Sequence, residues 1–229
     1  PKDGLGCNKG GLVIAREADI TAIDFETTGV VDELPSEPWQ IGMVGMRRGA
    51  VDGSRQFTSL LRVGDRPFNP NAPGNHHKQR SEIAAAPTMG ELWPELRDWW
   101  LGAPLAAHNI SVEKNLIQAA APLHEPGPWI DTLKLARVAY PALESHALEG
   151  LLIRLKLIDQ TRELCPGREA HDALFDAIGC AALLQHLLGL EGWSGVTVEQ
   201  LVNVQPDAYY KRVSERTRRR ATSRSSRAP

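Results

Sequence analysis

Two carboxylates stand at alternate positions near the beginning of the chain, in the stretch TAIDFETTG (21–29). The run begins with the apolar residues Ile20, Ala22 and Ile23 and contains no turn former, so a buried strand is expected there. Residues two apart on a strand point to the same face, so Asp24 and Glu26 lie side by side. Like charges at this distance repel and raise each other's pKa. A divalent cation would turn this repulsion into chelation.

Two further acids occur in otherwise apolar segments. Glu113 opens an expected helix just after a strand that ends near Ala107, and Asp176 lies within the most apolar helix of the chain. Acids are almost never fully buried unless they are paired or bind a metal, and no Lys or Arg is obviously placed to neutralise all four. Mg²⁺ and Mn²⁺ favour carboxylate oxygens, and two such ions about 3.5–4 Å apart can clamp a phosphodiester displacement.

Each of these groups also has an ordinary interpretation. The pair Asp24 and Glu26, taken alone, would more often lie on a surface, and Glu113 could simply stabilise a helix N-terminus. Asp176 is harder to explain in this way, because no partner can be identified for it. His171 would face away from Asp176 on a regular helix, so it is expected on the loop before that helix. Histidine can take a proton from water near neutral pH, although His171 alone could equally be a surface residue.

Composition favours a globular protein of the cytoplasm. The 229 residues are 42% hydrophobic and 24% charged, with no apolar run long enough for a membrane span and no opening signal peptide. The three cysteines form no CxxC pair, which argues against a disulfide framework or a structural zinc site and for a reducing compartment.

The net charge of −2 is unevenly distributed. Residues 211–229 hold eight Lys or Arg and one Glu, so they carry +7 and leave −9 on the other 210 residues. This tail has no apolar periodicity and is rich in Ser and Arg, so we expect it to be disordered. It would attract a polyanion, or it is a solvated terminus with no dedicated ligand.

The elements that must position the acids follow an α/β pattern. Strands are predicted at 20–26, 40–46, 56–62 and 104–107, with a strand, turn and helix at 128–138. Helices are predicted at 89–101, 111–120, 148–158, 173–188 and 197–204, with an irregular loop at 65–81. Strands first, then strands alternating with helices, indicate one α/β domain with a mixed sheet. The chain is thus divided into an extension (1–19), a domain (20–204) and the tail (205–229).

Four motifs in order, DFETTG, AHNISVEKN, DTLKLARVAYPALESHALEGLL and HDALFDA, resemble those of the DnaQ-like (DEDDh) 3′→5′ exonucleases. The resemblance extends from Ile20 to Leu188 and implies a ribonuclease H-like α/β fold with a five-stranded mixed sheet flanked by helices. The matching positions imply metal ligands at Asp24, Glu26, Glu113 and Asp176, and a general base at His171. By the same resemblance, the terminal nucleotide is contacted by Thr27, Thr28 and Asn109.

The second motif departs from the family pattern, because Glu113 stands where the family normally has Asp after His-Asn. The ligand chemistry is kept on a side chain one methylene longer, so the metal preference stays open. The resemblance implies hydrolysis at a 3′ end with release of nucleoside 5′-monophosphates and two Mg²⁺ ions, with Mn²⁺ as a substitute.

We expect the substrate to be single-stranded DNA or frayed 3′ ends, as in proofreading or repair. The alternative is the trimming of RNA 3′ ends, as in the RNase T and oligoribonuclease branches. A non-catalytic nucleic-acid-binding module is disfavoured, because all four acids and His171 are present. No membrane partner is expected. A homodimer through the helix of Trp93, Trp99 and Trp100, or association with a polymerase, is compatible with the sequence, although such tryptophans more often belong to a core.

Overall fold

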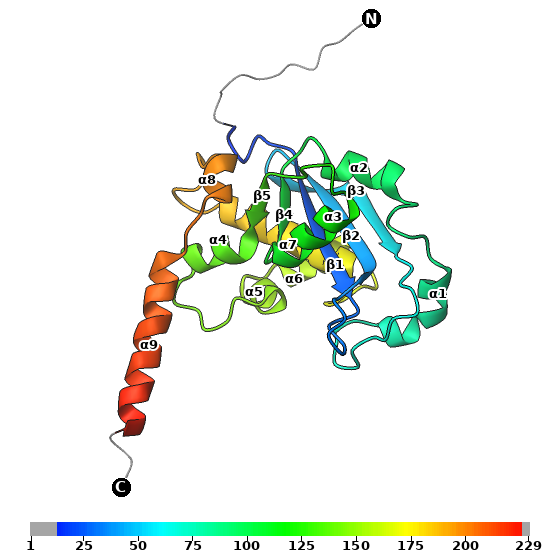
Figure 1. Cartoon of the computed structure of the whole chain (residues 1–229). Helices are drawn as coiled ribbons and strands as arrows, with labels where there is room; N and C mark the ends of the chain where they lie inside the picture. The colour runs from blue at the N-terminus through cyan, green and yellow to red at the C-terminus, as the bar shows by residue number, and fades with distance from the viewer. Residues whose placement is uncertain (1–12, 226–229) are drawn as a thin grey trace, which may run out of the picture.

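The computed structural model describes residues 13–225, and its centre is a five-stranded mixed sheet (Figure 1). The strand order is β3-β2-β1-β4-β5, with β1 antiparallel to β2 and parallel to β4. The strands are β1 (Ile20–Thr27), β2 (Pro38–Arg47), β3 (Ala50–Leu60), β4 (Leu105–Ala107) and β5 (Trp129–Asp131). The expected α/β class and mixed sheet are therefore confirmed. Most of the predicted extension 1–19 lies outside the described residues.

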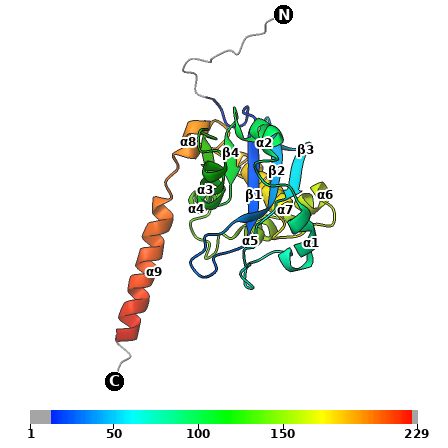
Figure 2. The same ribbon diagram turned by 45° about the vertical axis from the view of Figure 1, so that its right-hand side comes forward.

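Helices cover both faces of this sheet (Figures 1 and 2). The long helix α7 (Ala173–Leu188) packs on one face, while α2 (Trp93–Trp100) and α3 (Ser111–Ala120) pack on the other. The remaining helices are α1 (Arg80–Ala85), α4 (Thr132–Ala139), α5 (Leu148–Arg154), α6 (Ile158–Leu164), α8 (Val198–Val202) and α9 (Asp207–Ser225), with a 3-10 turn, η1, at His76–Lys78. None of the described helices combines the length and the apolar character that a membrane span requires.

Alternation along β1 decides which side chains face each layer. Ile20 and Ala22 belong to the core under α7, whereas Ile23 and Phe25 belong to the core under α2 and α3. The same parity puts Asp24 and the following acid, Glu26, on the α7 face, at the carboxyl end of the strand. One face of β1 is therefore apolar core for its first half and acidic for its second half.

The tryptophans of α2 belong mainly to the core. Trp100 is fully buried, while Trp93 and Trp99 are partly buried and pack against the same cluster. The helix itself begins later than the predicted 89–101, because residues 89–92 form turns before it. Pro94 lies in its first turn, where a missing backbone N–H costs nothing.

Gly42 lets the amino end of α7 approach the sheet closely. This residue of β2 pairs with Asp24, and a Cβ atom there would lie 2.2 Å from the backbone of both Ala173 and Leu174. Any side chain would push the first turn of α7 away from the acidic end of β1. The glycine therefore fixes the distance between the two elements that carry the acids.

We expect Gly42→Ala to lower the free energy of unfolding by about 3 kcal/mol or more, at the upper end of overpacking effects, because rigid backbone opposes the new methyl group. Gly179→Ala is the matched control within α7. Its Cβ would meet the flexible Cδ1 of Leu152 at 2.7 Å, and alanine has the better helix propensity. Denaturant unfolding of both variants measures the difference. Equal stability of the two variants would contradict the close approach at Gly42.

Two predicted segments differ from the structure in their details. The helix expected at 148–158 is divided into α5 and α6, because Lys156 has a φ of 59° in the left-handed region and interrupts the turn. The third strand begins at Ala50 instead of Gln56, since its pairing with β2 continues to the tight turn formed by Arg48 and Gly49.

The prediction of a disordered tail at 205–229 was wrong for most of its length, because α9 extends from Asp207 to Ser225. Residues 226–229 lie outside the described part. Two aromatic residues in the first turn, Tyr209 and Tyr210, pack against the guanidinium of Arg137 in α4 and start the helix on the domain. The Arg-rich sequence that follows has high intrinsic helix propensity. The remainder of α9 projects away from the body (Figures 1 and 2).

Candidate active site

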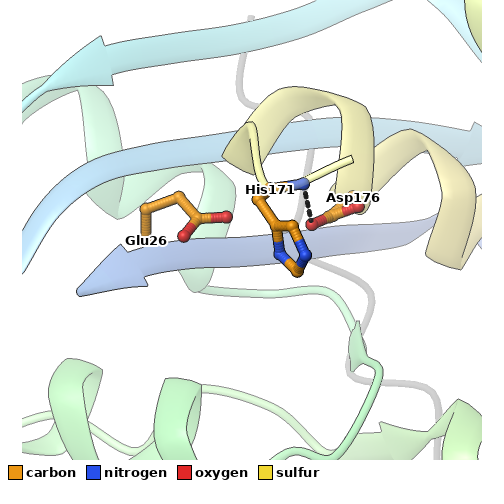
Figure 3. Close-up of side chains that lie close together, drawn as sticks. All are labelled: Glu26, His171 and Asp176. Carbon is orange, nitrogen blue, oxygen red and sulfur yellow. Dashed lines mark hydrogen bonds between the residues drawn. The ribbon is translucent and has the colours of Figure 1, made fainter. Parts of the chain in front are cut away.

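Three of the expected functional side chains converge at the carboxyl end of β1. The possible ligand atoms of Glu26, His171 and Asp176 all lie within 4.8 Å of one another (Figure 3). Asp176 comes from the first turn of α7, and the backbone N–H of His171 donates to its Oδ2 at 3.1 Å. His171 lies in the turn before the helix, with a φ of 66°, and its side chain is exposed. Its expected position on the loop before α7 is confirmed.

Asp24 and Glu113 extend this acidic group. Burial raises the pKa of Asp24 well above its ordinary value, and the charges of Asp176, Glu113 and Glu26 add to the effect in that order. Glu113, in the first turn of α3, is only 5% exposed, and its Oε2 atom has no hydrogen-bond partner. The structure thus brings Glu26, His171 and Asp176 together, and Asp24 lies close enough to Asp176, Glu113 and Glu26 for their charges to act on it.

Burial is the main cause of the raised pKa values of these acids. It raises the pKa of Glu26 to about 8, with further increases from Asp176 and Asp172. It raises the pKa of Glu113 to about 7. The pKa of Asp176 rises to about 6, although the hydrogen bond from the His171 N–H lowers it. The guanidinium of Arg168, beside the site, pairs at 2.6 Å with Asp172 and with none of the four acids.

These features fit divalent cations. The donors are carboxylate oxygens, which Mg²⁺ and Mn²⁺ prefer. The acids are close enough to repel one another, and the buried Oε2 of Glu113 lacks the partner that a buried polar atom requires. Bound cations would satisfy that atom and remove the repulsion.

The raised pKa of Glu26 predicts how stability depends on pH in the absence of metal. Its folded-state pKa of about 8 lies above the unfolded value of about 4.3, so the folded protein binds the extra proton. The free energy of unfolding therefore falls as pH rises from about 4.3 to about 8. Glu26→Gln removes this loss, and we expect its Tm relative to wild type to increase between pH 5 and pH 8 in EDTA. A Tm difference that stays constant over this range would contradict the raised pKa.

The three positions matched to nucleotide contacts differ in accessibility. Thr28 is buried, and its hydroxyl accepts a hydrogen bond from Glu37 N (3.0 Å) and donates to Gly29 O (3.1 Å), so it holds the loop after β1. Thr27 is half-buried at the end of β1. Asn109 is exposed, with a φ of 79°, and its Oδ1 accepts from the Ser111 hydroxyl. Thr27 and Asn109 are therefore accessible to a ligand, whereas Thr28 is engaged within the protein.

Sequence reasoning missed the residues that fix α7. Gln40, which pairs with Glu26 across the strands, donates from Nε2 to Asp172 Oδ2 (2.9 Å) and accepts from Ala173 N (3.3 Å). Asp172 also caps α7 by accepting from the N–H groups of Leu174 and Phe175. A polar Gln within an otherwise apolar strand was the available signal for this role.

Sequence reasoning also missed the contact between the irregular loop and the site. A Cβ atom at Gly74, which has a φ of 96°, would lie 3.3 Å from both Glu26 Oε2 and His171 O. The loop predicted at 65–81 therefore lies against the acids, and only a glycine fits at this point.

Comparison with known sequences agrees with this site. A profile of the exonuclease family RNase_T matches residues 21–184. Exodeoxyribonuclease 10 of Escherichia coli K12 is 31% identical over 187 residues, which are 80% of this chain and 73% of that protein. A DNA polymerase III subunit epsilon-like protein of Rhodobacter capsulatus is 28% identical over 168 residues, which are 72% of this chain and 23% of that protein.

Solved structures show the same architecture. Exonuclease X in complex with 5′ overhanging duplex DNA has a TM-score of 0.61 and 27% identity, over 81% of this chain and 98% of that chain. The nuclease domain of 3′hExo, described as a DEDDh family member, has a TM-score of 0.58 and 17% identity, over 80% of this chain and 97% of that chain. The ribonuclease H-like sheet and its acids define a phosphodiester hydrolase. The chain belongs to the DnaQ-like (DEDDh) 3′→5′ exonuclease family.

Proposed function

We propose that this protein removes nucleoside 5′-monophosphates one at a time from DNA 3′ ends that are single-stranded or frayed. The observation that carries the proposal is that the possible ligand atoms of Glu26, His171 and Asp176 lie within 4.8 Å of one another. These residues belong to an acidic group, and none of the described contacts pairs this group with a buried cationic side chain. The choice of DNA is supported by the similarity to Exodeoxyribonuclease 10 and to Exonuclease X, which was solved with DNA.

The residues divide the work of hydrolysis between binding and proton transfer. Asp24, Glu26 and Asp176 would hold two Mg²⁺ ions, or Mn²⁺ in their place. When bound, these ions lower the pKa of water and neutralise charge that develops on the phosphate. His171, exposed beside Asp176, would accept the proton of the attacking water. The hydrogen bond from the backbone N–H of His171 to Asp176 Oδ2 holds this carboxylate in place. The carboxylate would in turn orient the attacking water.

Glu113 would serve as the second-motif acid in this site. Its burial and its unpartnered Oε2 support this role, since a structural glutamate in such a place would have a hydrogen-bond donor beside it. The additional methylene lets the carboxylate contact the site either directly or through a water molecule.

The direct test uses 5′-labelled single-stranded DNA and RNA of the same sequence, with Mg²⁺, with Mn²⁺ and with EDTA. We expect a ladder that shortens from the 3′ end of the DNA, requires metal and is absent with Asp24→Asn. Faster shortening of the RNA would replace the DNA assignment with 3′-end trimming of RNA. Binding of either polymer without any ladder would contradict the nuclease and favour a binding module.

A further inference from the structure

The exposed part of α9 concentrates positive charge on one helix. All side chains from Lys211 to Arg219 are exposed, and five of these nine residues are basic against the single acid Glu215. Residues 211–229 carry +7, whereas the other 210 residues carry −9. A polyanion that approaches the domain is therefore repelled by the overall charge of the body and attracted by α9.

The first turn of α9 is attached to the domain by aromatic contacts. The Cζ atom of Arg137 lies 4.9 Å from the ring centroid of Tyr209 and 5.9 Å from that of Tyr210. Tyr209 also meets the ring of His146 edge-on, with the centroids 5.1 Å apart. These contacts fix the direction in which the basic residues leave the domain (Figures 1 and 2).

His146 connects the attachment of α9 to the segment that carries Glu113. The His146 carbonyl accepts from His108 Nε2 at 2.8 Å, and His108 lies at the beginning of the segment that leads into α3. In the same loop, Glu144 lies 3.8 Å from Arg216 of α9. In both views α9 runs in roughly the direction in which β1 points (Figures 1 and 2). Asp24 and Glu26 lie toward the carboxyl end of β1.

The composition of α9 indicates the kind of partner that it binds. Beyond Tyr210 its only apolar residues are Val213 and Ala221, so it has no apolar stripe for a membrane surface or a protein groove. Exposed basic side chains without such a stripe are the electrostatic footprint of nucleic-acid backbone binding.

We propose that α9 is an arm that binds the phosphate backbone of the substrate upstream of the 3′ end. This rests on the proposed function, because the site must hold a nucleic-acid 3′ end for a strand to extend along the arm. The 19 residues of α9 span about 28 Å, since each helical residue adds 1.5 Å. This length corresponds to roughly eight base pairs of duplex. The arm therefore contributes to the affinity for long substrates and leaves bond cleavage unchanged.

The test replaces three charges in the full chain, with Lys211→Gln, Arg212→Gln and Arg216→Gln together, because Gln keeps a good helix propensity. The matched control removes three charges at the amino end of β1, with Arg16→Gln, Arg47→Gln and Arg48→Gln. These three arginines are exposed and lie at the opposite end of β1 from the acids. The kinetics of each protein are measured on a 30-nucleotide single strand and on a dinucleotide over a range of salt concentrations.

We expect the arm variant to have a weaker salt dependence of KM on the 30-nucleotide strand, with a log–log slope smaller by about 2, or roughly 0.7 for each lost contact with a single strand. Its kcat should equal that of wild type on both substrates, and its KM should equal that of wild type on the dinucleotide, which is too short to contact α9. The control variant should keep the wild-type slope.

Two results would overturn the arm. One is a wild-type salt slope in the arm variant, and the other is an equal loss of slope in the control variant. A wild-type protein that cleaves neither substrate would overturn the proposed function and the arm with it. If all three proteins cleave the dinucleotide and either of these two slope results is found, the arm alone has failed and the proposed function stands.

Discussion

Replacing Asp24 with asparagine is expected to abolish measurable exonuclease activity while making the metal-free protein more stable. The carboxylate lies among Asp176, Glu113 and Glu26, and its burial and their charges raise its pKa well above the ordinary value. Loss of this proposed cation ligand should remove several kcal/mol of charge stabilisation from the transition state. At about 1.4 kcal/mol for each factor of ten, the rate should fall by about 10³-fold or more.

The gain in stability has the same physical origin. The asparagine side chain would have no charge to bury and none to repel the remaining acids, so the free energy of unfolding in EDTA near pH 8 should rise. Mg²⁺ should then raise the Tm of wild type and leave that of the variant nearly unchanged. Thermal melts with and without Mg²⁺, alongside the 3′-end ladder assay, measure both effects.

Asp98→Asn is the matched control, because it removes one acid on the exposed surface of α2, across the sheet from the site. It should keep wild-type activity and wild-type Tm. If Asp24→Asn lowered both activity and metal-free stability, the carboxylate would be a structural residue and would not be a ligand.

Removal of the imidazole at His171 is expected to slow hydrolysis by roughly 10²–10⁴, the usual contribution of a general base. His171→Asn is the sharper substitution, because the residue has a φ of 66° and Asn tolerates the left-handed region better than Ala does. The backbone N–H that donates to Asp176 Oδ2 is kept. Metal and substrate binding should therefore change little.

Single-turnover kinetics at rising enzyme concentration separate the two effects for this variant. The maximal single-turnover rate should fall. The enzyme concentration that gives half of the maximal rate should stay within about threefold of the wild-type value, because only transition-state interactions are removed. His77→Asn, an exposed histidine of the 3-10 turn η1, provides a comparable substitution in the loop beside the site and should be silent. A wild-type maximal rate for His171→Asn would exclude the general-base role.

Local patterns were sufficient to predict most of the elements. The bounds of α7 at 173–188 agree with the sequence prediction because its apolar run is continuous and Asp172 caps it. The first strand was equally clear, since Ile20, Ala22 and Ile23 are apolar and no turn former interrupts the run to Glu26. Its two acids and Asp176 attracted attention because charge is rare within such segments.

Features that depend on tertiary contact could not be predicted in this way. Nothing local in residues 205–229 shows that Tyr209 and Tyr210 contact Arg137, so the helix there was mistaken for a disordered tail. Similarly, the role of Gly42 depends on the backbone of α7, which lies far from it in the sequence. Both contacts join distant parts of the chain, and such contacts override the local propensities that single-sequence patterns encode.

The distribution of the site over the chain affects when the protein acquires its activity. Asp24 and Glu26 belong to the first strand, whereas His171 and Asp176 precede or open a helix that ends at Leu188 and is buried along nearly its whole length. Domains generally fold as units during synthesis, and contacts of such large sequence separation form late. A growing polypeptide that lacks α7 has only part of the proposed ligand set. We therefore expect the chain to attack nucleic acid only after synthesis has passed this helix, so a truncated translation product should be inert.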